Sequence, residues 1–221
     1  MLVSAMLANA NPKGLGPPVT RQRLSSADRR AAIVSAAVEL FSRHGFRGTT
    51  TRELAAMVGV SEPVLYQHFE TKRDLYTAIV DAMVSDVAAN ELPRLQALAS
   101  SNDDHAFFTT LGRMLLEWYF DDTHHIRLLL FSSLESHELA DLWHQRATLK
   151  FLSFIEDYIA RRAREGAFAV ANPALAARAY MGMVGHYGLT SVIFKCPFPE
   201  LSREQVIENF VDFFLNGIRN V

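Results

Sequence analysis

The sequence predicts an all-α fold in two parts, a small N-terminal three-helix unit and a larger helical body. Apolar residues recur at helical spacing along most of the chain, as at Ile33, Ala36 and Leu40. Residues that cap helices precede many of these stretches, and Gly or Pro follows several of them. No stretch alternates between apolar and polar residues as a half-buried strand would.

Composition favours a globular protein in a reducing compartment. Hydrophobic residues make up 49% of the 221 residues, enough for a sizeable core. No run of about 18 apolar, uncharged residues is present, so we expect no membrane-spanning helix. The N-terminus has no basic segment ahead of its weak apolar run, which argues against a signal peptide. Cys196 is the single cysteine and cannot form an intrachain disulfide, so we expect a cytoplasmic setting.

The net charge of −2 conceals a difference between the two parts of the chain. Residues 1–77 carry 10 Lys and Arg against 6 Asp and Glu, a balance of +4. Residues 78–221 carry 12 against 18, a balance of −6. A basic first third indicates a polyanionic partner there, and an acidic body would be repelled by the same partner.

The chain is expected to open with a flexible tail, because residues 1–24 contain prolines and glycines and show little periodicity. The first helix is expected to begin at Ser25 or Ser26, either of which can cap it. Its apolar face ends at Phe41, and Gly45 can take the left-handed conformation that ends a helix.

Two short helices joined by a tight turn are predicted within residues 50–72. Thr50 caps the first of them, with an acid three residues further on, and Gly59 ends it. The second helix begins at Ser61, and Pro63 is compatible with its first turn because the missing N–H would have no helical partner there.

The rest of the chain is also predicted to be helical. A helix that starts near residue 72 would run into the body, with Pro93 near its end. A long helix over about residues 138–165 is apolar on two sides, which predicts burial on two sides. Asn172 caps a later helix with glycines at positions 182, 185 and 188, and these suggest close approach of another backbone or of a ligand.

One set of residues runs in order and without gaps from Arg30 to Leu75. Its members are Arg30, Ile33, Ala36, Ala37, Leu40, Phe41, Gly45, Phe46, Thr49, Thr50, Leu54, Ala55, Val58, Gly59, Val60, Ser61, Leu65, Tyr66, His68, Phe69, Lys72 and Leu75. This pattern closely resembles the N-terminal signature of the TetR/AcrR family of bacterial transcriptional regulators. The resemblance is far more specific than a generic helix-turn-helix, and it covers the first unit only.

The resemblance implies a homodimeric, ligand-controlled DNA-binding protein, most often a repressor. It implies a helix-turn-helix DNA-binding domain, here residues 25–75, and a helical ligand-binding and dimerisation domain, here residues 76–221. The last two helices of each subunit would form a four-helix dimer interface. The residues expected there are Tyr180, Val184, Phe210, Phe213 and Phe214. The implied partners are double-stranded DNA, a small-molecule effector and a second copy of the chain, with no cofactor and no membrane.

The second short helix is the expected recognition helix, which would enter the major groove of DNA. Gln67 can make two hydrogen bonds to adenine, and Val64 can pack on a thymine methyl group. Arg52, on the preceding helix, can contact guanine. The full set of expected DNA contacts is Thr50, Arg52, Glu62, Pro63, Val64, Tyr66, Gln67, His68 and Lys72.

Four of these residues align with positions that hold phosphates in the family: Thr50, Tyr66, His68 and Lys72. Such contacts set the register of the protein on DNA rather than its sequence preference. Tyr66 and His68 can instead pack against the next helix. Glu62 can accept a hydrogen bond from a cytosine amino group, or it can simply interact with the helix dipole.

Aromatic and Met side chains in the body favour a mostly apolar or aromatic effector. The expected pocket residues are Phe107, Met114, Trp118, Phe131, Trp143, Phe151, Met181, His186 and Tyr187. For each of them taken alone a place in the core is favoured, and only as a set do they indicate the walls of a cavity. His137, Asp141 and His144 share one helix face, but without a fourth fixed ligand a solvated cluster is favoured and no metal site is predicted.

Two other classes of function are open to such a chain. An enzyme would need a catalytic motif, and no glycine-rich phosphate loop, GxSxG, HExxH or CxxC is present, so no catalytic residue is predicted. A helical protein-interaction module would leave the basic first third unexplained. We therefore expect a regulator, and we hypothesise that its effector acts through the helix that starts near Lys72 and crosses the domain boundary.

Overall fold

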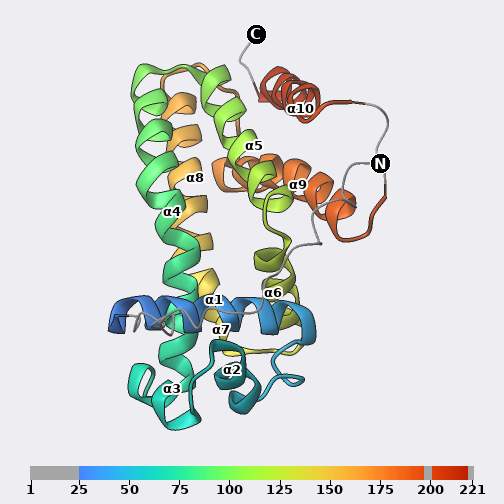
Figure 1. Ribbon diagram of the computed structural model, residues 1–221. Helices are drawn as coiled ribbons and strands as arrows, with labels where there is room; N and C mark the ends of the chain where they lie inside the picture. The colour runs from blue at the N-terminus through green and yellow to red at the C-terminus, as the bar shows by residue number, and fades with distance from the viewer. Residues whose placement is uncertain (1–24, 197–200, 219–221) are drawn as a thin grey trace, which may run out of the picture.

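The computed structural model describes residues 25–196 and 201–218, and its elements are helices (Figure 1). They are α1 Ser26–His44, α2 Thr51–Val58, α3 Glu62–His68, α4 Lys72–Ser101, α5 Asp104–Phe120, α6 Thr123–Leu134, α7 Glu138–Trp143, the π-helical η1 His144–Thr148, α8 Leu149–Arg164, α9 Pro173–Val192 and α10 Arg203–Ile218. The all-α prediction is confirmed. The predicted tail, residues 1–24, lies outside the described residues.

Two hydrophobic clusters form the described core. The first joins α1, α2 and α3, the helix-turn-helix unit, to the first part of α4 as far as Met83. It also takes in Leu128, Leu139 and Leu142 from α6 and α7. The second cluster joins the far part of α4 to α5, α8, α9 and α10. The long helix α4 therefore belongs to both clusters, and it runs from the helix-turn-helix unit to the far end of the body (Figure 1).

Side chains named from the sequence define the predicted helix ends. Ser25 caps α1 by accepting from the N–H of Asp28, and Gly45 follows α1 with a φ of 72°. Asn172 caps α9 with Pro173 in the first turn. Ser202 and Gln205 bond reciprocally at the start of α10, so this helix also begins as its sequence predicts.

The prediction that a helix ends near Pro93 is wrong. Helix α4 passes through this proline and ends at Asn102, whose φ is 58°. The Pro93 ring is exposed, and just beyond it Leu95 is fully buried in the second cluster. Burial of apolar side chains on this last part of the helix offsets the hydrogen bond that the proline removes.

The predicted single helix over residues 138–165 is interrupted. The π-helical η1 separates α7 from α8, and the N–H of Leu149 bonds to the carbonyl of His144. A π-helical stretch rotates the following residues about the helix axis relative to an uninterrupted α-helix. The rotation lets one continuous helical segment serve both clusters, with Leu139 and Leu142 in the first and Ile155 and Ile159 in the second.

One of the three glycines predicted to permit close approach does so clearly. A Cβ added to Gly188 would lie 2.6 Å from the ring of Tyr119, and one at Gly185 would lie 3.3 Å from the Tyr119 hydroxyl. Gly182 has nothing within 4 Å inside the described chain. The close neighbour is thus an aromatic side chain of α5 rather than a second backbone.

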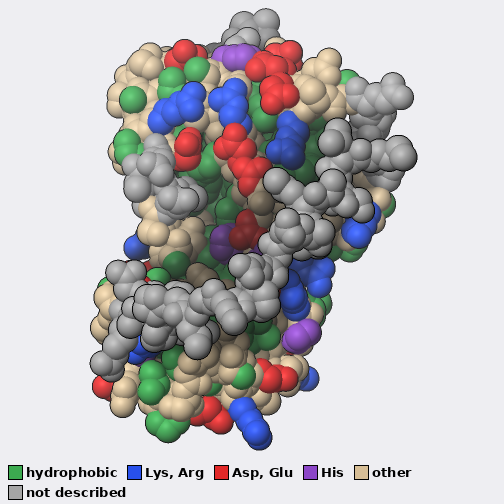
Figure 2. All heavy atoms as spheres, in the orientation of Figure 1, with side chains coloured by type: hydrophobic (Ala, Val, Ile, Leu, Met, Phe, Trp, Pro, Cys, Tyr) green, Lys and Arg blue, Asp and Glu red, His purple; other side chains and the backbone are tan. Residues whose placement is uncertain are grey.

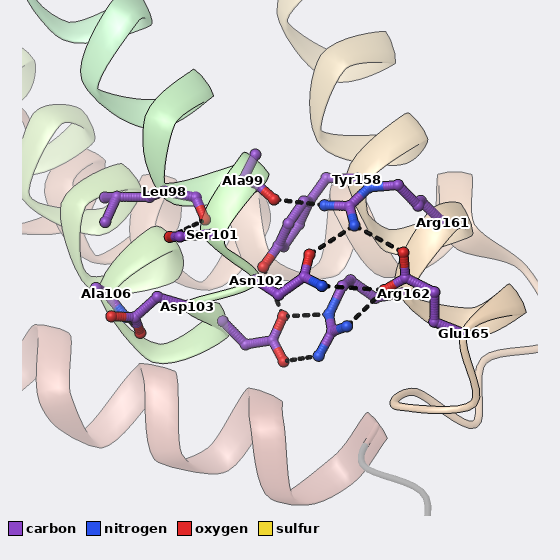
Figure 3. A network of polar contacts seen from close by, with 11 residues as sticks. Leu98, Ala99, Ser101, Asn102, Asp103, Ala106, Tyr158, Arg161, Arg162 and Glu165 are labelled. Atoms are coloured by element: carbon purple, nitrogen blue, oxygen red, sulfur yellow. Dashed lines mark hydrogen bonds and ion pairs between the residues drawn. The ribbon is translucent and has the colours of Figure 1, made fainter.

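A polar network closes the end of the body farthest from the helix-turn-helix unit (Figure 3). Arg162 pairs with Asp104 at 2.8 Å, and Tyr158 donates a hydrogen bond to the same carboxylate at 2.5 Å. Arg161 bonds to Asn102 and, through its other nitrogen, to the carbonyl of Ala99. The network ties the α4–α5 turn to α8, and basic and acidic side chains intermingle on this part of the visible face (Figure 2).

Candidate nucleic-acid interface

Local interactions hold α2 and α3 at a fixed angle. Thr50 and Glu53 form the predicted capping box, and hydrogen bonds from Thr50 keep the pKa of Glu53 below its usual value. Gly59 ends α2 in the left-handed conformation, as predicted. Ser61 stands at the start of α3, but its hydroxyl makes no capping hydrogen bond. The inner residue of α3, Leu65, is buried in the first cluster.

The other side of α3 faces outward. Tyr66 is 45% exposed, and Pro63 and Gln67 are also exposed. Val64 and His68 are half-buried. This arrangement leaves a short row of side chains available to a partner, supported from behind by Leu65 and by Phe69, which is 2% exposed.

Exposed basic side chains come from the two helices next to α3 in the chain. Arg52 on α2 and Lys72 at the start of α4 are exposed, and neither has an ion-pair partner among the residues that the structure describes. Arg30 instead lies over the ring of Phe69, 4.6 Å from its centre. Arg47, in the turn before α2, is exposed and was not predicted as a contact, although its charge next to the predicted phosphate-binding Thr50 was a usable signal.

Two of the expected DNA contacts already have partners within the protein. The Thr50 hydroxyl donates to Glu53 at 2.9 Å, so its proton is not available to a phosphate in this conformation. Glu62 accepts a hydrogen bond from the Thr51 hydroxyl at 2.8 Å and thereby joins α3 to α2. Both residues are better explained by the shape of the helix-turn-helix unit than by contact with DNA.

The expected effector residues are spread through the body. Phe107 and Met114 are buried in the second cluster, where Phe107 stacks on Tyr158 with ring centres 4.0 Å apart. Trp118 and Trp143 stack on each other at 5.9 Å beside the first cluster. Phe131, Phe151, Met181 and Tyr187 are half-buried, and His186 is exposed.

Two surface hollows lie elsewhere. One, of about 280 Å³, lies where α1, α4 and α6 meet, and His124, His125 and Asp122 line it. The other, of about 570 Å³, is a groove between α4 and α8, lined in part by Phe154 and Arg161. None of the nine expected effector residues lines either hollow.

The structure corrects three of the five residues expected at a dimer interface. Tyr180 and Val184 are fully buried in the subunit's own core, and the Tyr180 hydroxyl donates to the carbonyl of Phe108 at 2.5 Å. Phe214 is 6% exposed and packs in the same cluster. Phe210 is half-buried, whereas Phe213 is 66% exposed. Side chains that point into their own subunit cannot contact a partner. They can only support the exposed residues that do.

Within residues 25–196 and 201–218, no group of three or more His, Cys, Asp and Glu side chains is placed to hold a metal ion. Across the same described residues, every helix is too short or too polar to span a membrane.

The fold and the exposed face of α3 define a helical two-part protein of the helix-turn-helix class. The family model for "Bacterial regulatory proteins, tetR family" matches residues 33–79. The model for "AefR-like transcriptional repressor, C-terminal domain" matches residues 109–217. The chain therefore belongs to the tetR family of bacterial regulatory proteins.

Two curated relatives match part of the chain. The HTH-type transcriptional activator FasR of Mycolicibacterium smegmatis is 34% identical over 103 residues, which is 47% of this chain and 44% of FasR. The class C tetracycline repressor protein of Escherichia coli is 41% identical over 66 residues, 30% of each chain. The chain thus spans less than half the length of either relative.

The likeness to solved structures extends over most of the chain. The structure of AibR, solved in complex with isovaleryl coenzyme A and operator DNA, has a TM-score of 0.65 at 22% identity. The match covers 84% of this chain and 97% of AibR. At this level of identity the likeness shows the shared fold.

Proposed function

We propose that the chain is a sequence-specific DNA-binding transcriptional regulator that acts as a homodimer and represses until a small effector releases it. One observation carries the proposal: α3, joined by a tight turn to the capped helix α2, presents Tyr66 and Gln67 outward, and the exposed Arg52 of α2 and Lys72 of α4 have no ion-pair partner in the described structure. Base edges are read by such side chains, and phosphates by the cations that flank them. Repression is supported by the match to the AefR-like repressor model.

A gel-shift experiment with the DNA that flanks the chain's own gene tests this function. We expect a shifted band that weakens steeply as salt rises, because the binding of cations to phosphates releases counterions. A footprint of the shifted complex should show a near-palindrome. Absence of binding to any promoter fragment would overturn the proposal and favour a helical protein-interaction module or an enzyme.

The homodimer would use the outward faces of α9 and α10. Leu175 and Phe213 are 64% and 66% exposed, and an apolar patch that includes them would mark a surface that binds a partner. Tyr180 and Val184, buried behind this surface, would stiffen it. Two subunits joined in this way should hold their recognition helices about 34–36 Å apart or somewhat wider, near one turn of B-DNA. Equilibrium sedimentation measures the expected dimer directly.

The effector would be mostly apolar or aromatic. The half-buried aromatic and Met side chains of the body are the remaining candidates for its walls: Trp118, Phe131, Trp143, Phe151, Met181 and Tyr187. Phe107 and Met114 would act as core behind them. On this proposal the chain would act by binding rather than by catalysis, and it would do so in the cytoplasm, where its operator DNA lies.

Release would operate through α4, which joins the two clusters. An effector that binds one arrangement of the body more tightly would shift α4 and the helix-turn-helix unit packed on it. Because such coupling is reciprocal, operator DNA should weaken effector binding by the factor by which effector weakens DNA binding. Equal effector affinity with and without DNA would contradict this route.

A further inference from the structure

The turn between α6 and α7 holds the turn between α1 and α2. Glu135, directly after α6, accepts hydrogen bonds from the backbone N–H groups of Phe46 at 3.1 Å and Arg47 at 3.0 Å. Both bonds go to the same carboxylate oxygen, Oε2. One charged side chain of the body thus fixes two consecutive peptide groups of the segment that leads into α2. The other oxygen lies so close to Gly45 that an added Cβ would overlap it.

An aromatic contact adds to these hydrogen bonds. The imidazole of His137 stacks on the ring of Phe46, with centres 3.7 Å apart and planes 18° from parallel. Tyr76 of α4 meets the edge of both rings. His137 is itself fixed, because its Nδ1 accepts from the N–H of Leu139 and caps α7.

Two further contacts reach the same region from the same part of the body. Arg127 of α6 donates to the carbonyl of Ser42 in the last turn of α1, at 2.9 Å. Glu138 of α7 pairs with Arg73 in the first turn of α4, at 3.1 Å, although both side chains are well exposed and the pair contributes little. The strongest attachment is therefore the group of Glu135, His137, Phe46 and Arg47, called the latch below.

We propose that Glu135 and His137 are positioning residues for DNA binding, and that the latch fixes α2 and α3 to the turn between α6 and α7, in addition to their packing on α4. This inference rests on the proposed function. The latch holds the chain at Arg47, three residues before Thr50, the cap of α2. Helix α3 follows α2 through a turn of fixed angle. The tilt of the recognition helix relative to the body is then set at two places.

A consequence follows for the spacing of the two half-sites in the operator. A dimer whose recognition helices are rigidly attached loses little conformational entropy when it binds an operator of the matching half-site spacing. To bind an operator of any other spacing, it must distort. If the latch is lost, the first cluster still holds the unit to α4, α6 and α7, so the chain folds. The unit can then tilt, which weakens binding at the matching spacing and reduces the penalty at others.

The test uses the full-length chain and the operator footprinted next to its own gene. Binding is measured on that operator and on derivatives with one base pair inserted or removed between the half-sites. Glu135→Ala should bind the matching operator about tenfold more weakly, and its preference for that operator over the derivatives should shrink by a similar factor. The affinity and the spacing preference of Glu135→Gln should lie between those of the wild type and of Glu135→Ala, because the amide oxygen can accept the same hydrogen bonds without the charge.

Glu117→Ala is the matched control, since Glu117 is exposed on α5 and its side chain has no partner in the described part of the chain. It should keep both the affinity and the spacing preference of the wild type. Thermal unfolding of each variant separates loss of folding from loss of positioning. A general loss of stability would lower all affinities together and leave their ratio unchanged.

The outcomes distinguish the two proposals. If the wild type binds its operator and Glu135→Ala keeps the wild-type ratio between spacings, the latch has no positioning role and only this inference fails. If the wild type binds no operator, the proposed function fails, and the role of the latch in DNA binding fails with it. Faster amide exchange at Phe46 and Arg47 in Glu135→Ala, measured without DNA, is expected in support.

Discussion

Two exposed side chains, Lys72 and Gln67, are expected to make different contributions to the proposed DNA contact. Lys72 is exposed and has no ion-pair partner in the described structure, so its charge is available to a phosphate. Gln67 is exposed on α3 and offers both a donor and an acceptor to a base edge. Charge and hydrogen-bond pattern therefore separate strength of binding from sequence preference.

Lys72→Ala should weaken binding to every DNA sequence by a similar factor. The slope of log binding constant against log salt should become shallower by about 0.9 for each phosphate that the protein no longer neutralises. Lys150→Ala, which removes an exposed lysine on α8, is the control and should leave the slope unchanged. An unchanged slope for Lys72→Ala would mean that this lysine contacts no phosphate.

Gln67→Ala should relax the choice of one base pair in each half-site. A bidentate amide–adenine contact discriminates by about 1–3 kcal/mol, so the preferred base pair should lose roughly that advantage while affinity for unrelated DNA stays the same. Binding to a set of operators with each base pair replaced in turn measures this. A uniform loss at all positions would instead assign Gln67 to the shape of α3.

The sequence predicts which side chains of α3 point outward, because helix period, caps and the Gly59 turn are local features. The capping box predicted at Thr50 already implied a partner for this residue, but the sequence could not predict that Glu62 has one. A hydroxyl or carboxylate finds its partner among whatever atoms the folded chain brings near, and the bond from Thr51 to Glu62 joins residues 11 apart across the turn. Glu135 was missed for the same reason, since its partners lie 88 and 89 residues away.

Among the elements, α9 allows a comparison of two glycines in one helix. Gly188→Ala should lower the free energy of unfolding by about 1–3 kcal/mol, because its Cβ would lie 2.6 Å from the Tyr119 ring. Gly182→Ala meets nothing within 4 Å inside the subunit and should raise that free energy by up to about 1 kcal/mol through helix propensity. Denaturant unfolding at a fixed protein concentration measures both.

Equal stability of the two alanine variants would contradict the close packing of α5 on α9. A loss of stability in Gly182→Ala that grows on dilution would have another meaning. It would place a partner subunit against the outward face of α9, in agreement with the proposed dimer.

The errors at the level of elements share a cause. Pro93 was expected near the end of a helix, and η1 was not expected within one. Both outcomes depend on tertiary burial, which a local sequence pattern does not reveal. Leu95, beyond the proline, is buried in the second cluster, and the residues before and after η1 are buried in different clusters. Local signals predict where helices start more reliably than whether tertiary packing carries them past a weak point.

In the whole molecule, the latch should make stability depend on pH. Burial lowers the pKa of His137 below its ordinary value of 6.5, with Lys72 acting in the same direction and Glu135 and Glu138 opposing. Tyr76, which faces the ring, stays neutral because burial and Glu138 raise its pKa to about 12. The unfolded chain then binds a proton at His137 more readily than the folded chain. The free energy of unfolding should fall as pH drops from about 6.5 through the lower folded-state pKa.

His137→Asn isolates this effect, because asparagine can cap α7 but does not titrate. Between pH 7 and about pH 5 the variant should lose less stability than the wild type. The pKa of His125 is also lowered by burial, but His125 is present in both proteins and cancels in the comparison. Equal losses in the two proteins would show that His137 is not the group that responds.

The first hydrophobic cluster has a consequence for how the molecule unfolds. Leu128, Leu139 and Leu142 of α6 and α7 complete the core on which α1, α2 and α3 pack, so the helix-turn-helix unit has no complete core without the body. Melting of the body would remove these side chains and melt the unit with it. A calorimetric scan should therefore show one cooperative transition for the chain. A molecule bound anywhere in the body would raise the melting temperature of the distant recognition helix by mass action, without touching it.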